Sequence, residues 1–204
     1  DGGPGDEPGS AEALAGARID LTALRERKEA VVGGTVAAHE RMFSASGMDF
    51  VLGTARFVGE RTAELTLADG ATRRVRGRRV LVNTGTEPAV PPIEGLADVP
   101  SWTSEDVLRL EELPDRLVVL GGGVIGVEMA SMLATFGVRV TLLEGGEHVL
   151  GREDPDVAEV VAQGLAADGV EVLTSARAAR VAHDGQGVAV TTTDGRQVTG
   201  DRLL

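Results

Sequence analysis

The chain has 204 residues, which allow one domain or two small ones. Its 20 Lys and Arg against 32 Asp and Glu give a formal net charge of −12, which disfavours a protein that binds nucleic acid through the phosphate backbone. Cysteine is absent and the three histidines stand far apart, so the sequence predicts no disulfide and no metal site. No apolar run is long enough to cross a bilayer, and we expect no membrane partner.

The N-terminal part of the chain changes from a polar segment to a helix. Residues 1–17 begin with Gly, Pro, Asp and Glu, which cannot bury apolar surface, and this segment is predicted to be disordered. Apolar residues at helical spacing then predict a long helix over 21–43. The pair Gly33-Gly34 predicts a weak point within that helix.

Strand patterns follow from Asp49 onward. An apolar alternation with period two predicts three short antiparallel strands, and Asp69-Gly70 predicts a tight turn. The arginine-rich run 73–79 predicts a solvated strand and turn, and the apolar run 80–82 predicts a buried strand. The three short strands are expected at 50–52, 55–58 and 63–67.

Four prolines between 88 and 103 predict a linker between two domains. Behind it, strands alternate with helices, which predicts a parallel sheet covered by helices, and three β runs then predict an antiparallel meander. The last residues, 201–204, match the start of another buried strand, so we expect a truncated chain. The strands are expected at 117–120, 138–143, 170–173, 178–183 and 187–192, and the helices start near 124 and 155 and end before Gly137 and Gly169. The second helix is expected to carry Val157, Val160, Val161 and Leu165 on one apolar face.

A glycine-rich loop joins the first strand of this pattern to its first helix. Gly121, Gly123 and Gly126 form G-x-G-x-x-G in the context that a dinucleotide fingerprint requires. The first glycine permits a tight turn, the second leaves room for a pyrophosphate, and the third lets helix and strand pack closely. The free amides at the start of the helix would hold the phosphates. The remaining residues of this cofactor-binding loop are Gly122, Val124 and Ile125.

Two acids accompany the loop. Glu144 ends the next strand, 18 residues after Gly126, where a carboxylate accepts hydrogen bonds from the adenosine ribose and repels a 2′-phosphate. No arginine follows it directly, so the sequence favours NAD(H) over NADP(H). Glu128 on the helix is either a solvent-facing residue or a carboxylate aimed at a partner outside the pyrophosphate site, and the sequence leaves both readings open.

In this order, the motifs resemble those of the FAD-dependent pyridine nucleotide–disulphide oxidoreductases, which include dihydrolipoyl dehydrogenase, glutathione reductase and mercuric reductase. The run 80–85, VLVNTG, is similar to the family's A-T-G motif, with Asn83 in place of Ala. Residues 103–114 resemble the crossover into the NAD domain, and 121–128, GGGVIGVE, match its nucleotide fingerprint. The meander matches the family's usual insertion. The runs VNTG, VPPIEG and GREDPDVAE look closest to mercuric-reductase-like members and the reactive-chlorine-resistance flavoproteins.

The resemblance implies an α/β fold in two parts. A Rossmann-like NAD-binding domain, truncated at its last strand, would occupy 106–204, and 18–105 would be the remainder of an FAD-binding domain. The family's C-x4-C pair would lie upstream, and its interface domain, through which members form homodimers, would lie downstream. The whole protein would be a cytoplasmic enzyme that passes a hydride from NADH to FAD. Its dithiol, outside this chain, would then reduce a disulphide or a metal-ion acceptor.

The resemblance also places three pairs of residues beside FAD. One pair would approach the cofactor, one would hold its adenine through backbone groups, and the third would lie near the same cofactor. In that order, the pairs are Thr84 and Gly85, Thr54 and Ala55, and Ser104 and Glu105. Glu128 matches the family's glutamate that pairs with a lysine beside the flavin, which makes it the catalytic candidate. Val124 stands where some relatives have a tyrosine that gates the nicotinamide pocket, so this pocket is expected to be less gated.

Two other functions stay open. A stand-alone NAD(H)-binding or sensing module would require 106–204 to fold alone, and a missing last strand, which leaves an open parallel edge, argues against it. A flavoprotein of the same plan without the dithiol, such as a ferredoxin reductase or an NADH oxidase, is the other. The sequence upstream of Asp1 would distinguish it, because a C-x4-C pair there indicates the disulphide family.

Overall fold

The structure is a computed structural model that describes residues 19–183, 185 and 187–204. These residues form two compact units, one of Glu26–Ala89 and one that joins Val90–Leu204 to the described residues up to Arg25. Residues 1–17, predicted to be disordered, lie outside the described residues, and so does Asp184, between the strands expected at 178–183 and 187–192. The domain boundary expected at residue 105 stays a prediction.

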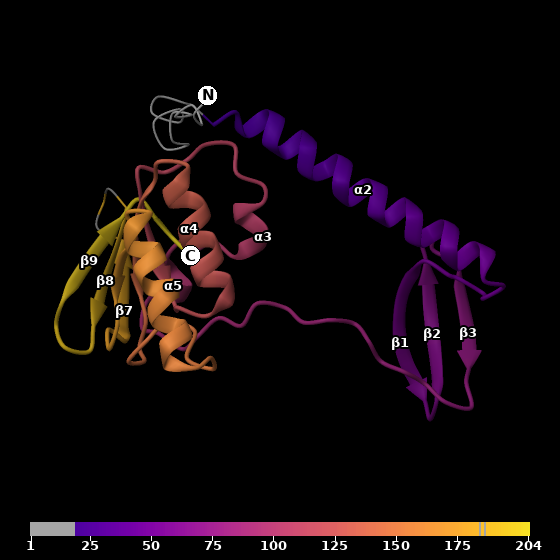
Figure 1. The fold of residues 1–204 in the computed structure, drawn as a ribbon. Coiled ribbons are helices and arrows are strands. Elements are labelled where there is room, and N and C mark those ends of the chain that lie inside the picture. The colour runs from indigo at the N-terminus through magenta and orange to yellow at the C-terminus, as the bar shows by residue number, and fades with distance from the viewer. Residues whose placement is uncertain (1–18, 184, 186) are drawn as a thin grey trace, which may run out of the picture. The chain divides into compact units, whose positions relative to one another are not determined.

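The smaller unit consists of a helix and an antiparallel meander (Figure 1). The predicted long helix is confirmed as α2 (Leu21–Ala45), which runs without a break through Gly33-Gly34, and the weak point expected there stays a prediction. A glycine in a helix interior costs about 1 kcal/mol relative to alanine, which lowers stability without ending the helix. The meander has strand order β1-β2-β3, with the predicted turn at Asp69-Gly70 between the last two strands. Its strands are β1 (Gly53–Gly59), β2 (Thr62–Leu67) and β3 (Thr72–Arg76).

Two strands predicted for this unit are absent from it. Residues 50–52 lie outside β1, and 80–82 form no strand, with Leu81 92% exposed. The apolar run 80–82 was interpreted as a buried strand because such runs are typical of central strands. A central strand needs paired neighbours and covering layers, and the described residues of this unit supply neither to 80–82. The predicted arginine-rich strand is confirmed as the exposed strand β3.

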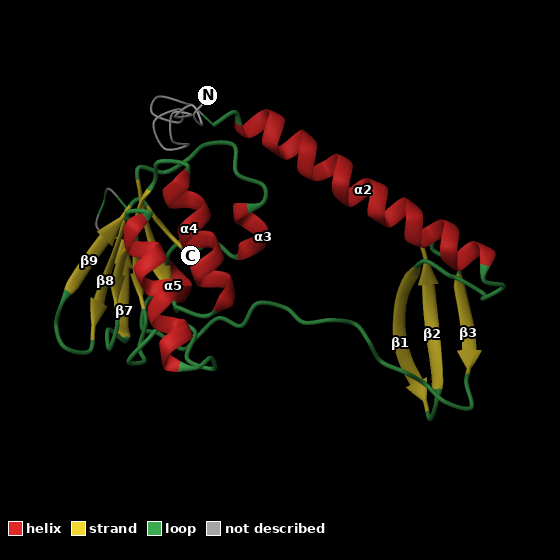
Figure 2. Ribbon diagram, in the orientation of Figure 1, coloured by secondary structure: helices red, strands yellow, loops and turns green. Residues whose placement is uncertain are grey.

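The larger unit is built on a parallel sheet of strand order β10-β4-β5-β6. Figure 2 shows the helices α3, α4 and α5 of this unit in red and its strands in yellow. Its neighbouring strands pair in parallel, with Leu117 opposite Val140 and Leu142 opposite Val172. This is the predicted α/β fold with a Rossmann-like sheet. The strands are β4 (Arg116–Leu120), β5 (Arg139–Leu143), β6 (Glu171–Leu173) and β10 (Arg202–Leu203), and the helices are η1 (Leu96–Asp98), α3 (Ser104–Val107), α4 (Val124–Thr135) and α5 (Pro155–Ala167).

The predicted meander forms a second sheet of this unit. Its strands β7 (Ala178–His183), β8 (Val188–Thr192) and β9 (Gln197–Gly200) pair antiparallel in chain order. The predicted glycine ends of the two long helices are confirmed, because Gly137 and Gly169 follow them with φ of +92° and +86°. Positive φ is readily adopted only by glycine, and it lets the chain turn back toward the sheet.

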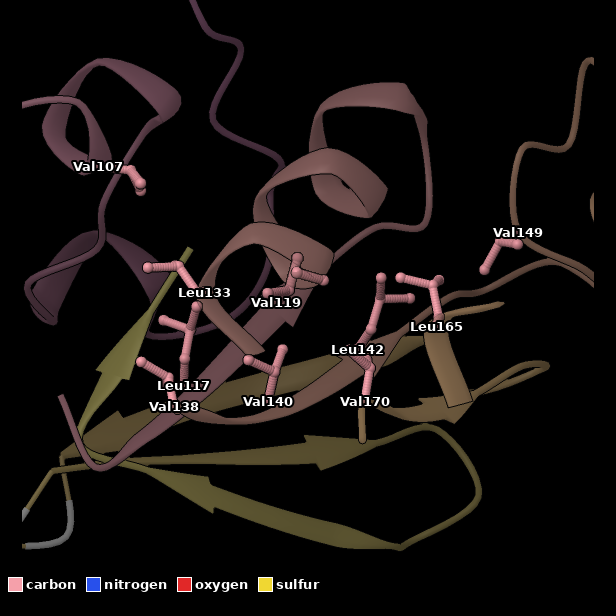
Figure 3. Packing of buried hydrophobic residues seen from close by; sticks show 11 residues of the cluster. Val107, Leu117, Val119, Leu133, Val138, Val140, Leu142, Val149, Leu165 and Val170 are labelled. Atoms are coloured by element: carbon pink, nitrogen blue, oxygen red, sulfur yellow. The ribbon is translucent and has the colours of Figure 1, made fainter. Parts of the chain in front are cut away.

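Alternate residues of strand β4 divide the core between two faces of the parallel sheet. Leu117 and Val119 pack with Leu133 of α4 and Leu165 of α5, as Figure 3 shows. Val118 belongs to the second cluster, with Val181, Val188 and Val190 of the meander. Successive strand residues point to opposite faces, so the apolar run of β4 serves both layers.

The apolar face predicted for α5 is correct only in part. Leu165 is buried and Val161 packs on the core, but Val157 and Val160 are 49% and 68% exposed. Leu165 and Val161 are four residues apart and share a face of the helix. Val157 and Val160 flank that face, so the apolar pattern is wider than the surface that α5 packs against.

The linker residues before α3 join the free edge of β10. Ser101 forms a parallel bridge with Leu203, and Trp102 N–H donates to the Leu203 carbonyl (2.7 Å). The Arg202 guanidinium lies 5.8 Å from the Trp102 ring centroid, a cation–π contact. Strand β10 therefore pairs with the edge of β4, and the linker pairs with the outer edge of β10.

An ion pair ties the start of β4 to the turn before β10. Asp201 Oδ1 accepts from Arg116 Nη2 (2.9 Å) and Nε (3.2 Å), and Oδ2 accepts from the Arg116 backbone N–H (2.8 Å). Burial raises the pKa of the Asp201 carboxyl, but the hydrogen bonds and positive charge of Arg116 outweigh it, so the pKa lies below its ordinary 3.8. The charged carboxylate therefore stabilises the folded state.

Asp201→Asn is expected to lower the free energy of unfolding by about 1–2 kcal/mol at neutral pH, because the charge-assisted bonds are lost. Both side chains are partly exposed, and solvent screening keeps the effect small. Since folding lowers this pKa, the stabilisation is present above the unfolded pKa and is lost as the pH falls through the folded value. Denaturant titrations of both chains should converge below about pH 4. A difference that persists in acid would contradict this account.

Candidate functional site

The glycine-rich loop leaves β4 and enters α4 through two defined backbone conformations. Gly121 has φ +101°, and its N–H donates to the Leu143 carbonyl of β5 (2.8 Å). Gly123 is the N-cap of α4, with extended backbone, and its carbonyl accepts the first helical bond from Val127 N–H (2.9 Å). The turn thus aims the start of α4 at the carboxyl end of the parallel sheet, where open α/β folds bind ligands.

Gly126 fits against the turn itself. A Cβ there would overlap the Gly121 carbonyl oxygen and lie 3.4 Å from Val119 Cγ1. Because the opposing atom is backbone, it has no rotamer by which to move away. The third glycine therefore sets how closely α4 approaches β4, as the sequence predicts.

Gly123, by contrast, faces open space. A Cβ at this position would meet no atom within 4 Å, and the next residues, Val124 and Ile125, are exposed. The first N–H groups of a helix have no partner within it, and their partial positive charge favours a phosphate. This combination of open backbone and helix start fits the pyrophosphate of a dinucleotide.

Glu144 lies directly after β5 and is fixed by two backbone amides. Its Oε2 accepts from Gly122 N–H (2.7 Å), and its Oε1 accepts from Gly146 N–H (2.6 Å). A carboxylate has about four acceptor positions, so both oxygens can still accept hydroxyl hydrogens. A direct hydrogen bond thus joins Glu144, the acid predicted to bind the ribose, to the glycine-rich loop 121–126, which we call the phosphate loop.

Gly122 has a packing role that the sequence pattern does not indicate. It is buried, and a Cβ there would lie 2.8 Å from Val149 Cγ1 and 3.2 Å from the Glu144 Cβ. Its carbonyl accepts from Leu150 N–H (2.7 Å). The position is variable in G-x-G-x-x-G, so only the contact with the segment after Glu144 shows why glycine stands here.

The candidate residues for FAD lie apart from this loop in the chain. Thr54 and Ala55 are exposed on β1, and Thr84 and Gly85 are exposed in a segment without regular structure. A Cβ at Gly85 would meet no atom within 4 Å, so the described residues form no cradle around it. The smaller unit by itself therefore shows no built FAD site.

Ser104 and Glu105 form the first turn of α3. The capping box of this helix comes from their neighbours, because Asp106 Oδ2 accepts from the Thr103 backbone (2.7 Å) and hydroxyl (2.8 Å). These two bonds hold the pKa of the Asp106 carboxyl below its ordinary range. Glu105 pairs with Arg109 (3.6 Å). The contacts around Ser104 and Glu105 are therefore the capping bonds and the ion pair that stabilise the start of α3.

Glu128 is exposed on α4, and no hydrogen bond or ion pair to another described residue involves its side chain. Both readings of this residue therefore stand. Within 19–183, 185 and 187–204, no three histidine or acidic side chains gather in a way that could hold a metal ion. None of the helices described here is both long and apolar enough to cross a membrane.

The parallel sheet, the glycine-rich loop between β4 and α4, and the acid after β5 have the arrangement of a Rossmann-like domain. Residues 4–204 match the family described as Pyridine nucleotide-disulphide oxidoreductase. The chain belongs to this family. The resemblance inferred from its motifs is thereby confirmed.

Relatives within the family cover most of this chain. A mercuric reductase from Acidithiobacillus ferrooxidans is 42% identical over 152 residues, which are 74% of this chain and 27% of that protein. The probable pyridine nucleotide-disulfide oxidoreductase RclA from Escherichia coli is 37% identical over 158 residues, 77% of this chain and 35% of that protein. This chain thus spans about a third of the length of these relatives.

Two solved structures have the same fold. LpdA from Mycobacterium tuberculosis superposes with a TM-score of 0.78 at 32% identity, over 95% of this chain and 44% of that one. The Cu(II) complex of the HOCl-induced flavoprotein disulfide reductase RclA from Escherichia coli gives 0.75 at 34% identity, over 92% and 42%. These structures confirm the α/β fold inferred from the sequence.

Proposed function

We propose that this chain is the nucleotide-binding part of a flavoprotein oxidoreductase, with 106–204 as its NAD-binding domain and 18–105 contributing to the FAD side. In the whole protein, FAD would take a hydride from NADH and pass the electrons, through a dithiol outside this chain, to an acceptor. The observation that carries the proposal is the phosphate loop, with its open Gly123 and its bond to Glu144.

Each part of the site has a separate task. The N–H groups at the start of α4 would bind the pyrophosphate, and Glu144 would accept the ribose hydroxyls. Val124 and Ile125, exposed on the first turn, would present apolar surface beside the nicotinamide and exclude water there. Glu128, four residues after Val124, would orient a cationic partner toward the reacting end. Together these groups position the nucleotide, and positioning lowers the barrier to hydride transfer.

Four of the proposed FAD contacts are exposed residues of the smaller unit. Thr54, Ala55, Thr84 and Gly85 are exposed, as a surface that receives a large cofactor must be, but they form no cradle by themselves. We therefore assign these four residues to one side of the FAD site. Ser104 and Glu105, which belong to the larger unit, are proposed as FAD contacts from the family resemblance.

We propose a disulphide or a metal ion as the acceptor. Relatives named mercuric reductase and a structure titled as a Cu(II) complex of a disulfide reductase support this range of acceptors. A homodimer and a cytoplasmic location are proposed from the family resemblance. The alternatives, a stand-alone NAD(H) module or a flavoprotein without a dithiol, gain no specific support from the site.

The test is anaerobic reduction of the flavin in the full-length protein that contains this chain. Adding NADH should bleach the visible flavin absorbance in a rapid phase that saturates with NADH concentration. Purified protein without flavin, or flavin that NADH leaves oxidised, would overturn the proposal. Protein without flavin that still binds NADH would favour the stand-alone module.

Glu144→Gln is expected to shift the nucleotide preference toward NADPH by roughly tenfold in the ratio of kcat/KM values. The variant removes the charge that repels a 2′-phosphate and weakens the bonds to the ribose hydroxyls. Flavin reduction by NADH and by NADPH, measured side by side, gives the ratio. A wild-type protein that already prefers NADPH, or an unchanged ratio in the variant, would contradict the role of Glu144.

A further inference from the structure

A second loop is bonded onto the segment after β5 that carries Glu144. This loop, residues 174–177, connects β6 to β7. Glu144 N–H donates to the Leu173 carbonyl (2.9 Å), Ala176 N–H donates to the Glu144 carbonyl (2.8 Å), and Ser175 N–H donates to the Gly146 carbonyl (2.6 Å). Two backbone hydrogen bonds from the loop and one accepted by the end of β6 therefore fix its position beside the predicted ribose site.

The loop places Arg177 against Gly145, the residue after Glu144. The Arg177 Cζ and Nη2 atoms each lie 3.5 Å from the point that a Cβ on Gly145 would occupy. Because Gly145 has no side chain, the guanidinium can lie directly over the backbone there. The structure thus brings an arginine to the adenosine end of the site from 33 residues further along the chain.

No acid among the described residues neutralises the charge of Arg177. Its side chain is exposed, and no carboxylate of the described residues lies within 4.0 Å of it. Two arginines in or beside the meander that follows are paired: Arg180 with Glu94 (3.4 Å) and Arg196 with Asp194 (2.8 Å). A guanidinium has a planar set of donors that matches a phosphate group, and an unpaired one attracts anions.

We propose that Arg177 is a specificity-determining residue that binds the 2′-phosphate of NADP(H), so the site accepts NADPH as a second nucleotide beside NADH. This inference rests on the proposed function, because it places the adenosine ribose at Glu144. The charge of Glu144 opposes the 2′-phosphate, and Arg177 offsets that repulsion. The sequence predicts a preference for NAD(H) because no arginine directly follows Glu144. Arg177 comes from a later loop, so the spacing around Glu144 does not reveal it.

Binding of two matched probes tests the proposal without requiring turnover. ADP-ribose and 2′-phospho-ADP-ribose differ only in the 2′-phosphate, and calorimetry with the full-length, FAD-loaded protein gives a Kd for each. Arg177→Gln should weaken 2′-phospho-ADP-ribose roughly ten- to hundredfold, the range for a lost charge-assisted contact, and leave ADP-ribose unchanged. Arg177→Lys keeps the charge without the planar donors, and its Kd for 2′-phospho-ADP-ribose should lie between those of the wild type and Arg177→Gln. The 2′-phospho-ADP-ribose affinity of wild-type protein should also fall more steeply with salt.

Arg180→Gln is the matched control. Arg180 lies three residues after Arg177 and carries the same charge, but it is already paired with Glu94. An equal loss for both probes in Arg177→Gln, or the same selective loss in Arg180→Gln, would overturn the role of Arg177. Wild-type protein that binds ADP-ribose but not 2′-phospho-ADP-ribose would also overturn it and leave the proposed function intact. Wild-type protein that binds neither probe would overturn the proposed function itself.

Discussion

Gly126→Ala is expected to destabilise the larger unit by about 3 kcal/mol and to abolish nucleotide binding together with it. The added Cβ would overlap the Gly121 carbonyl oxygen, so α4 must move away from β4. That movement opens the core at Val119, which lies 3.4 Å from the same point, and displaces the N–H groups at the start of the helix. Packed interiors resist even one extra methyl group when the opposing atoms are backbone.

Denaturant unfolding and nucleotide binding measure the two consequences in the same protein. Gly164→Ala is the matched control, since Gly164 lies within α5 and a Cβ there would meet no atom within 4 Å. This control should raise stability by about 0.5–1 kcal/mol, because alanine favours a helix. A Gly126→Ala protein as stable as wild type would show that the close contact between turn and helix is wrong.

Gly123→Val is expected to have the opposite pattern, with a normal fold and a lost site. No atom lies within 4 Å of its Cβ position, so the free energy of unfolding should fall by no more than about 1 kcal/mol, the cost of replacing a favourable N-cap residue. The branched side chain would fill the space proposed for the pyrophosphate, and NADH reduction of the flavin should slow at least roughly a hundredfold. FAD content should stay at the wild-type level.

Stopped-flow flavin reduction and the flavin-to-protein ratio test this expectation. Gly164→Val supplies the control, because it adds the same side chain at an exposed, uncrowded position of the same unit. Unchanged reduction kinetics in Gly123→Val would remove the phosphate loop from the proposed function. Together, the Gly126 and Gly123 variants separate a glycine needed for packing from one needed for the ligand.

The larger unit could be predicted well from the sequence because its signals are local. Pro155 and Gly169 mark the ends of α5, and the glycine loop lies between a strand and a helix of recognisable period. The run 80–82 could not be predicted in the same way. Its apolar residues indicate a strand only if neighbouring strands exist, and pairing partners are a property of the fold.

The site shows the same division. Glu144 and the three fingerprint glycines could be found from spacing, because the turn, the helix start and the strand tip fix their relative positions. The packing role of Gly122 and the position of Arg177 could not, since each depends on a contact with a distant segment: Gly122 with Val149, and Arg177 with Gly145. A motif specifies the residues that a turn requires, whereas the neighbours of that turn depend on how later segments fold back.

The contact between the linker and β10 has a mechanical consequence. Ser101 and Trp102 are bonded to Leu203, and β10 is in turn paired with β4 at the centre of the sheet. Tension on the chain before Glu94 would first load the bond that the Val181 N–H donates to the Glu94 carbonyl and then the bonds to Leu203, so it would reach both sheets before it reaches α3. The linker is thus bonded to the sheets, which are the rigid part of the unit, and the tension does not reach α3 and its capping box.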